Sequence, residues 1–337
     1  MSDGREELAV LDELAPRYAG LVESLRSVVI GQHDVIEQLV VGVFCEGHAL
    51  IVGVPGLAKT LLVRSVAAAL DLDFRRIQFT PDMMPGDVLG SELLTTDAAT
   101  GERSMRFAAG PVFGNLILAD EINRTPPKTQ AALLEAMAER QVTVSGRTMR
   151  LPEPFIVIAT QNPIEQEGTY PLPEAQLDRF MLGLRMTYPK PAEERRIVAA
   201  GDEIAARSRA VKPVFSGAEL VRLRGLIGRI PLAEHVVEHA VALVRATRPQ
   251  DETCPADLAR FIEWGAGPRA GQALVLGSRC LAALEGEPSP TLQHVQRLAP
   301  AVLRHRVVLN YAAAAEGISA DDVVERLVRE VPVPRYR

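Results

Sequence analysis

The hydrophobic pattern of the first two thirds of the chain alternates between strands and amphipathic helices. Helices are predicted where apolar residues recur at helical spacing, over residues 6–29, 35–44, 59–70 and 128–140. Strands are predicted at the short runs 50–52, 74–79, 115–120 and 155–160. Residues 80–90 contain a Pro-Gly turn that leads into a short helix. This part of the chain is therefore neither all helical nor all β.

Two further segments have the pattern of β-hairpins. Gln141 to Leu151 alternates polar and apolar residues around Ser145-Gly146, a dipeptide that favours a tight turn. Thr95 to Phe113 is polar around Gly101, which we place at a hairpin tip, and this segment has the character of an insertion. Basic and apolar side chains are mixed in both segments, so we expect them to contact a substrate, unless they only pack between subunits.

The last third of the chain has a different pattern. After a predicted helix from Glu193 to Arg209, a boundary falls near Lys212-Pro213 and divides the chain into residues 1–211 and 212–337. From Ser216 onward every pattern is helical, with helices expected over 217–227, 233–247, 256–264, 269–283, 291–303 and 320–329. The second part is therefore expected to be an all-helical domain.

Two motifs in this second part do not carry the function that their pattern is typical of. His235 and His239 have the HxxEH order of a zinc protease site, but no third ligand can be placed, so we expect a solvated helix face. Gly265 to Ala270 is similar to a dinucleotide-binding fingerprint, which requires a preceding strand. Because a helix is predicted up to Trp264, we reject this fingerprint.

The strongest chemical signal is the sequence LIVGVPGLAKTLL at residues 50–62. It predicts a strand, a glycine loop and a helix, which is the arrangement of a phosphate-binding P-loop. Gly53 and Gly56 allow backbone N–H groups to point at phosphate oxygens, and the helix N-terminus adds partial positive charge. Lys59 is placed to reach the β- and γ-phosphates, and the Thr60 hydroxyl to bind Mg²⁺. The alternative is a plain glycine turn between a core strand and a core helix.

Ala58 departs from the general P-loop pattern, which has glycine immediately before the lysine. We expect alanine to be tolerated if its φ is helical. A further nucleotide contact is predicted at Ile30-Gly31-Gln32, a turn whose backbone could face an adenine, although the triplet also fits a plain turn between helices. The predicted nucleotide-binding residues are Ile30, Gly31, Gln32, Gly53, Val54, Pro55, Gly56, Leu57, Ala58, Lys59, Thr60 and Leu61.

An apolar strand ends in two carboxylates, Asp120 and Glu121. Downstream of a P-loop, this is the form of a Walker B element. Asp120 is predicted to hold Mg²⁺, usually through water, and Glu121 to accept a proton from the attacking water or to polarise it. Acidic residues at a strand end are also common as helix caps. The P-loop favours ATP hydrolysis over that alternative.

Two polar residues further along belong to the same predicted site. Asn162 follows the strand at 155–160 and precedes a proline, so its amide could orient the lytic water, or it could only cap a turn. Arg179 follows a short helical run and is expected at a subunit edge, where it would reach a neighbour's γ-phosphate. The alternative for Arg179 is an ordinary surface salt bridge.

Length and composition set limits without identifying a function. The 337 residues are 47% hydrophobic and 24% charged, which suits ordinary cores in about two domains. The net charge of −6 argues against a broadly basic nucleic-acid surface, and Cys45, Cys254 and Cys280 are too few for a disulfide framework. The acidic start of the chain is not a signal peptide, and Glu46 and His48 interrupt the most apolar stretch. We expect a soluble, cytoplasmic protein without membrane insertion.

Five motifs together resemble the MoxR family of AAA+ ATPases: GVPGLAKT, LADEINR, ATQNP, LPEAQLDRF and GAGPRA. They occur in the family's order over most of the chain. The resemblance implies an α/β fold, with a P-loop core of five parallel strands between helices and a small all-helical lid. It identifies Asn162 as sensor 1, Arg179 as the arginine finger and Arg269 as sensor 2. Ala58 matches the family form, whereas Gly267 replaces the serine that is usual in the last motif.

The resemblance also implies a function. MoxR proteins are thought to act as chaperone-like remodellers, often with partners that contain a von Willebrand factor A domain. We therefore predict an Mg²⁺-dependent ATPase that forms a homo-oligomeric ring, expected to be a hexamer, and remodels or matures a protein client. The alternatives are a nucleic-acid motor or loader of the AAA+ class and a nucleotide-gated assembly scaffold. Whether Arg269 acts on its own subunit's nucleotide or a neighbour's stays open at this point.

Overall fold

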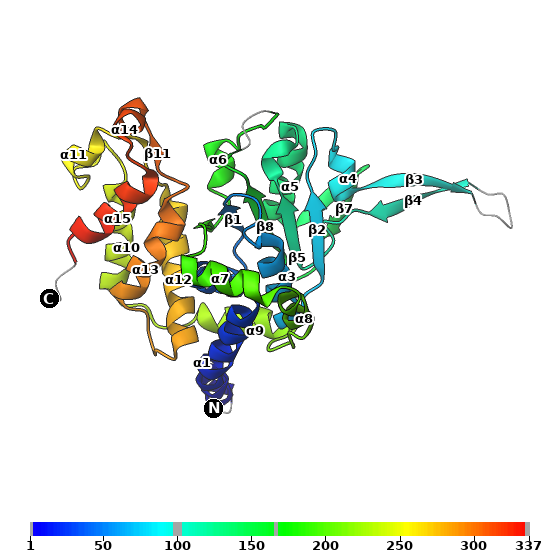
Figure 1. Ribbon diagram of the computed structural model, residues 1–337, viewed down its shortest axis with the longest axis horizontal. Helices are drawn as coiled ribbons and strands as arrows, with labels where there is room; N and C mark the ends of the chain where they lie inside the picture. Colours follow the sequence, from blue (N-terminus) through cyan, green and yellow to red (C-terminus); the bar gives the residue numbers. More distant parts are fainter. Residues whose placement is uncertain (1–2, 97–102, 165–167, 334–337) are drawn as a thin grey trace.

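A computed structural model describes residues 3–96, 103–164 and 168–333, without the side chains of residues 3–10 and 12. Its core is a five-stranded sheet in the order β2-β5-β8-β1-β9, and every pairing is parallel (Figure 1). The strands are β1 (Ala49–Val52), β2 (Phe74–Gln78), β5 (Leu116–Asp120), β8 (Ile156–Gln161) and β9 (Leu182–Arg185). The predicted α/β class with five parallel strands is therefore confirmed. The hydrophobic pattern had not located β9, a run of four residues.

Helices cover both faces of this sheet. Alternate residues of β5 and β8 point to opposite faces, as the period of a strand requires. Leu116 and Ile158 pack with the helices on one face, and Ile117 and Val157 with those on the other. The first group includes α1 (Asp3–Val28), α2 (His33–Phe44) and α3 (Lys59–Ala69), and the second includes α4 (Pro85–Leu89) and α5 (Pro127–Glu139). Burial on both faces explains why these strands are continuous apolar runs in the sequence.

Both predicted hairpins are present. β6 (Gln141–Val144) pairs with β7 (Arg147–Arg150), and β3 (Gly90–Thr96) pairs with β4 (Arg103–Ala109) in a long hairpin that projects from the body (Figure 1). The long hairpin begins earlier than the predicted Thr95, because Gly90 and Gly110 let the backbones approach closely at its base. A Cβ on Gly90 would lie 2.4 Å from the Ala108 carbonyl oxygen. The predicted tip at Gly101 lies outside the described residues.

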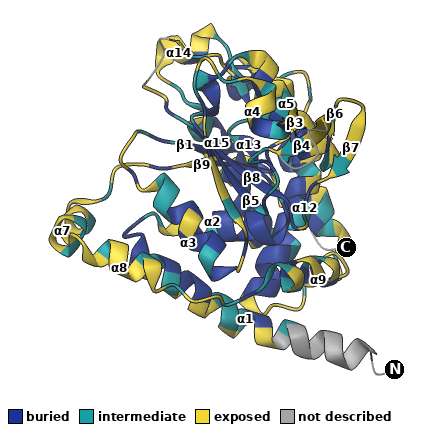
Figure 2. Cartoon of the chain, turned by 90° about the vertical axis from the view of Figure 1, so that its right-hand side faces the viewer, coloured by how far each residue is buried: buried dark blue, intermediate teal, exposed yellow. Residues whose placement is uncertain are grey.

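The helix predicted from Glu193 to Arg209 is two helices. α7 (Pro191–Ala200) and α8 (Glu203–Arg209) are separated at Gly201, whose φ of +44° interrupts the helical path. Neither helix contains a buried residue, and both run along the outside of the molecule (Figure 2). Because solvent surrounds most sides of both helices, their sequence has no regular apolar face. The hydrophobic periodicity therefore could not show where the first helix ends and the second begins.

The C-terminal part consists mainly of helices that pack beside the core. They are α9 (Gly217–Ile227), α10 (Glu234–Ala246), α11 (Ala256–Ala259), α12 (Pro268–Glu285), α13 (Leu292–Leu303), α14 (Tyr311–Glu316) and α15 (Ala320–Glu330). We refer to residues 217–330 as the lid. The division of the chain near residue 212 stays a prediction. Within the described ranges, no helix is long and apolar enough to cross a membrane.

The expectation of a lid without strands is wrong. β10 (Ile262–Trp264) pairs antiparallel with β11 (Val308–Leu309), so the helix predicted over 256–264 ends early. This pairing joins segments far apart in the sequence, and local periodicity cannot detect it. A short strand therefore does precede Gly265, which removes the reason given for rejecting the dinucleotide fingerprint. That strand belongs to a two-stranded antiparallel pair, however, and not to the parallel sheet on which the fingerprint depends.

The prediction that His235 and His239 lie on a solvated helix face is also wrong in part. His239 is fully buried, and burial lowers its pKa. The described residues contain no group of three or more His, Cys, Asp or Glu side chains that could hold a metal ion. The zinc protease interpretation therefore has no support.

A buried carboxylate joins the core to the lid. Glu46, between α2 and β1, forms ion pairs with Arg140 at the end of α5 and with Arg224 of α9. It also accepts a hydrogen bond from the N–H of Phe155, just before β8. Three elements therefore converge on one side chain with 6% exposure. The N-terminal end of the sheet is fixed to the lid at this point.

His48, two residues further on, is held in the neutral form. Its Nδ1 accepts a hydrogen bond from the N–H of Val157 at 3.0 Å, and Nε2 lies 3.2 Å from the Met137 carbonyl oxygen. These contacts require the tautomer in which Nε2 carries the proton. Burial lowers the pKa of His48 from 6.5 to about 4. The folded protein therefore takes up a proton on this ring only at a lower pH than the unfolded chain.

This shift predicts a loss of stability in acid. The contribution of His48 is complete above pH 6.5 and is lost as the pH falls to about 4, because only the unfolded chain binds the proton in that range. We expect the loss to reach ~3 kcal/mol in the free energy of unfolding. His48→Gln should flatten this decline in urea titrations, whereas His33→Gln, at an exposed position, should not. Equal acid profiles for wild type and His48→Gln would contradict the assignment.

Candidate functional site

The P-loop lies between β1 and α3, where the sequence predicts it. Gly56 has a φ of +83°, in the left-handed region that glycine enters without strain. A Cβ on Gly53 would lie 3.0 Å from the Met186 carbonyl oxygen, so glycine allows the loop to approach the end of β9. Nζ of Lys59 donates a hydrogen bond to the Gly53 carbonyl oxygen at 2.6 Å. The loop therefore curls around the lysine that ends it.

Ala58 has a φ of +61° and a ψ of 25°. This is the left-handed region, where a residue with a Cβ is less stable by roughly 1–2 kcal/mol. We expected alanine to be tolerated if its φ were helical, and this condition is not met, because the φ is left-handed. The conformation is the one for which the general pattern uses glycine, so the loop keeps its shape despite the substitution.

Asp120, at the end of β5, has both carboxylate oxygens occupied. Oδ1 accepts a hydrogen bond from the Thr160 hydroxyl at 2.6 Å, and Oδ2 accepts one from Nη2 of Arg76 at 2.7 Å. The side chain is 11% exposed. A guanidinium and a hydroxyl each donate to one carboxylate oxygen. Asp120 is therefore oriented from two neighbouring strands, β2 and β8.

Glu121 follows in a left-handed conformation, with a φ of +58°. Its N–H donates to the Thr160 hydroxyl at 2.9 Å, and its Oε2 accepts from Nε2 of Gln78 at 3.2 Å. Arg124 lies 3.3 Å from the same carboxylate. Although Glu121 precedes a short 3₁₀ helix, its side chain forms no cap hydrogen bond there. The helix-cap alternative therefore does not account for this residue.

Three residues around these carboxylates were missed by the sequence analysis: Arg76, Gln78 and Thr160. Arg76 and Gln78 are two residues apart on β2, so they share a face, and Arg76 also donates to the Gln78 side chain. Polar residues that alternate within a strand beside a Walker B strand were the available signal. Thr160 had a weaker signal, a hydroxyl at the end of an otherwise apolar run.

Asn162 comes directly after β8. Val52 and Gln161 are partners in the register, and the N–H of Gly53 donates to the Gln161 carbonyl oxygen at 3.2 Å. The end of β8 is therefore bonded to the start of the P-loop. Asn162 is 4% exposed, and its Oδ1 accepts a hydrogen bond from the N–H of Ile164 at 3.2 Å. It caps a turn, as the alternative stated, at a position next to the P-loop.

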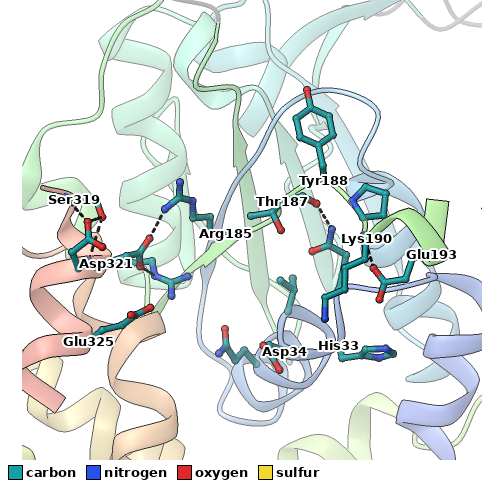
Figure 3. A pocket seen from close by; sticks show the side chains of 16 residues that line it. His33, Asp34, Arg185, Thr187, Tyr188, Lys190, Glu193, Ser319, Asp321 and Glu325 are labelled. Carbon is teal, nitrogen blue, oxygen red and sulfur yellow. Dashed lines mark hydrogen bonds and ion pairs between the residues drawn. The ribbon is translucent and has the colours of Figure 1, made fainter. Parts of the chain in front are cut away.

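A cavity of about 650 Å³ lies between the core and the lid (Figure 3). Gln32 lines it, and its Nε2 donates to the Thr187 carbonyl oxygen at 2.6 Å. Ile30, which is buried, and Gly31, which lies against Glu193, are not among the residues that line the cavity. Residues on both sides of Met186, which contacts Gly53, also line it. The cavity is therefore next to the P-loop and has the size of an ordinary ligand site.

The two predicted arginines are connected through Asp178, the neighbour of Arg179 in the sequence. Arg179 is exposed after α6 (Glu174–Leu177), and its Nη1 donates to the Leu134 carbonyl oxygen at 3.3 Å. Arg269, in the first turn of α12, lies 3.5 Å from Oδ2 of Asp178, and the buried Arg306 binds Oδ1 of the same carboxylate at 2.8 Å. Arg269 is therefore paired with the residue adjacent to Arg179.

These features define the class of protein. A parallel sheet places a P-loop, two carboxylates and a polar amide at the carboxyl ends of neighbouring strands, and helices follow as a lid. This is the architecture of a P-loop ATPase of the AAA type.

Comparisons with known proteins agree with this class. Residues 48–182 match the model of the ATPase family associated with various cellular activities (AAA), and residues 256–327 match the AAA lid domain. The chain is 40% identical to Chaperone MoxR1 of Mycobacterium tuberculosis, over 92% of this chain and 81% of that protein. It is 30% identical to Protein MoxR of Paracoccus denitrificans, over 94% and 96%. The chain belongs to the MoxR family of AAA+ ATPases and hydrolyses ATP.

A solved structure supports the same fold over the whole chain. It is a crystal structure of a protein from Cytophaga hutchinsonii, provisionally named an ATPase, with 37% identity and a TM-score of 0.88. The similarity covers 99% of both chains. The arrangement of core and lid is therefore similar in an experimentally determined relative.

Proposed function

We propose that the strand ends described above bind ATP with Mg²⁺. Lys59 would donate to the β- and γ-phosphates, with the backbone of residues 53–61 around them, and Gln32 would face the base from the adjoining cavity. Thr60 and Asp120 would hold the metal. One carboxylate and one hydroxyl suit Mg²⁺, which keeps several waters and phosphate oxygens as ligands. The observation that carries this proposal is the bond between Gly53 and Gln161, which joins the P-loop to the neighbouring strand.

In this proposal the remaining residues act on the attacking water. Glu121 would accept its proton, and Asn162 would orient it through the side-chain amide. Glu121 is suited to this role because it directly follows Asp120 at the end of β5. Gln78 and Arg124 hold the carboxylate in the described conformation. Mg²⁺, when bound, would neutralise the charge that develops on the phosphates.

We further propose that Arg179 and Arg269 act together on the nucleotide of a neighbouring subunit in a ring. The support is the pairing of Arg269 with Asp178, the residue directly before Arg179 in the sequence. Arg269 is 61% exposed, so its guanidinium is accessible to another subunit. A homo-oligomer, which we expect to be a hexamer, would then complete each site with two arginines from the next copy.

Mixed oligomers test this arrangement. Arg179→Ala and Arg269→Ala should each bind ATP but hydrolyse it more slowly, with a loss of ~10³-fold for the finger. Lys59→Ala should not bind ATP, yet it keeps both arginines. Mixing it with either arginine variant should therefore restore part of the steady-state activity, because intact sites form at mixed interfaces.

Arg260→Ala, which removes an exposed lid arginine paired with Glu316, is the matched control and should behave as wild type. Recovery with Arg179→Ala but not with Arg269→Ala would place Arg269 on its own subunit's nucleotide. No recovery with either variant would contradict a shared site.

We propose a protein client, remodelled or matured in a chaperone-like reaction. The relative from Mycobacterium tuberculosis is named a chaperone, and the family resemblance suggests partners with a von Willebrand factor A domain. The long hairpin supports this proposal. Leu94 and Met105 face each other across its strands with 61% and 53% exposure, beside the exposed Arg103 and Arg106. Exposed apolar side chains on a projecting hairpin are suited to contact a polypeptide.

The alternatives are a nucleic-acid motor and a nucleotide-gated scaffold. The hairpin β6–β7 carries exposed arginines at 147 and 150, which could contact phosphates, but the net charge of −6 provides no broad basic surface. A backbone-tracking motor would gain affinity from such contacts and lose it steeply with salt.

Stimulation of the ATPase discriminates these functions. We expect a candidate protein with a von Willebrand factor A domain to raise the ATPase rate, and single-stranded DNA, duplex DNA and RNA to have little effect. Leu94→Ser with Met105→Ser should abolish the stimulation and keep the basal rate, whereas Tyr311→Ser, at an exposed lid position, should keep both. Strong, salt-sensitive stimulation by nucleic acid alone would instead support the motor. No stimulation by any partner would favour the scaffold.

A further inference from the structure

The hydroxyl of Thr160 connects two consecutive residues of the Walker B element. It donates to Oδ1 of Asp120 at 2.6 Å and accepts the N–H of Glu121 at 2.9 Å. Thr160 is fully buried near the end of β8. The hydroxyl therefore donates its single proton to the Asp120 carboxylate and accepts the Glu121 N–H with an oxygen lone pair.

Each of these bonds fixes something that the backbone alone does not. The bond to Asp120 is short and has an ionised acceptor, which makes it one of the stronger kinds of hydrogen bond. The bond from Glu121 stabilises a residue with a φ of +58°, a conformation that is unfavourable for a side chain of this size. The register between β5 and β8 ends at Ala119 and Ala159, so the ladder does not hold Glu121.

We propose that Thr160 is a positioning residue for ATP hydrolysis, an inference that rests on the proposed roles of Asp120 and Glu121. Its hydroxyl orients the carboxylate of Asp120 and keeps the backbone of Glu121 in the left-handed conformation. It touches neither substrate nor metal in this account. Thr160 thereby fixes the position of the proposed metal ligand, Asp120, relative to the proposed base, Glu121.

The second contact of Asp120 makes the orientation depend on Thr160. Arg76 binds Oδ2 from the edge strand β2, at a position that is 45% exposed. Without the Thr160 hydroxyl, Arg76 is the remaining side-chain partner of Asp120 described here, and the carboxylate is free to turn toward its guanidinium. The N–H of Glu121 loses its acceptor in the same substitution. Displacements of this kind, of about 1 Å, are able to reduce a rate ~10²-fold.

The test compares Thr160→Val, which keeps the shape but removes the hydroxyl, with Thr160→Ser, which keeps the hydroxyl. For Thr160→Val we expect kcat to fall ~10²-fold, the Kd for ATP to stay within about 3-fold, and half-saturation to require several-fold more Mg²⁺. Thr160→Ser should retain kcat within about 3-fold of wild type. Rescue by serine, together with the shift in Mg²⁺ dependence, is a result that a merely structural role would not produce.

Thr129→Val is the matched control for loss of a buried hydroxyl. Thr129 is 1% exposed and donates to the Met83 carbonyl oxygen at 2.8 Å, so its variant should lower the Tm while keeping kcat. Thr160→Val with wild-type kcat, or with a lower Tm as its only effect, would overturn the inference. Glu121→Gln separates the two proposals. If it hydrolyses ATP normally, the proposed function fails, whereas an inactive Glu121→Gln beside an active Thr160→Val removes only the role of Thr160.

Discussion

The site depends on the parallel register of three neighbouring strands, β5, β8 and β1. Because their carboxyl ends lie side by side, the P-loop, the carboxylates and Asn162 reach one edge of the sheet without any long connection between them. Polar contacts then join the strand ends, from Gly53 to Gln161 and from Thr160 to Asp120. Burial of both sheet faces keeps this register fixed, since a slip of one residue would exchange the two sets of core side chains.

The N-terminal end of the same sheet is fixed to the lid by Glu46 through Arg224, and the other end carries the proposed nucleotide site. The core and the lid therefore have contacts at both ends of the strands. At the carboxyl end, Arg185 of β9 forms an ion pair with Asp321 of the lid. At the amino end, where the N–H of Met181 donates to the His48 carbonyl oxygen, Asp178 binds Arg306 and Arg269 from the lid, so the position of Arg269 depends on how the lid lies against α6. A change in the angle of the lid would move Arg269 relative to Arg179, which belongs to the core.

Much of the fold was predictable from the sequence, because β5 and β8 are buried on both faces and their helices have one apolar side. The P-loop was predictable for a local reason, since its residues are consecutive. Arg76 and Thr160 were not, because their roles arise from pairing between strands that are distant in the sequence. The same reason applies to β10, which pairs with β11. Ala58 shows a different limit, since its left-handed φ is imposed by the loop and not by alanine's own preference.

In the proposed ring, each nucleotide site is formed by the strand ends of one subunit and by two arginines of the next. A structure of the Glu121→Gln variant assembled with ATP and Mg²⁺ tests this claim directly. We expect a closed ring in which Lys59 and Asn162 of one subunit, and Arg179 and Arg269 of its neighbour, lie within hydrogen-bond distance of the same γ-phosphate. An Arg269 bound to its own subunit's phosphate, or ATP bound to a monomer with both arginines in solvent, would contradict it.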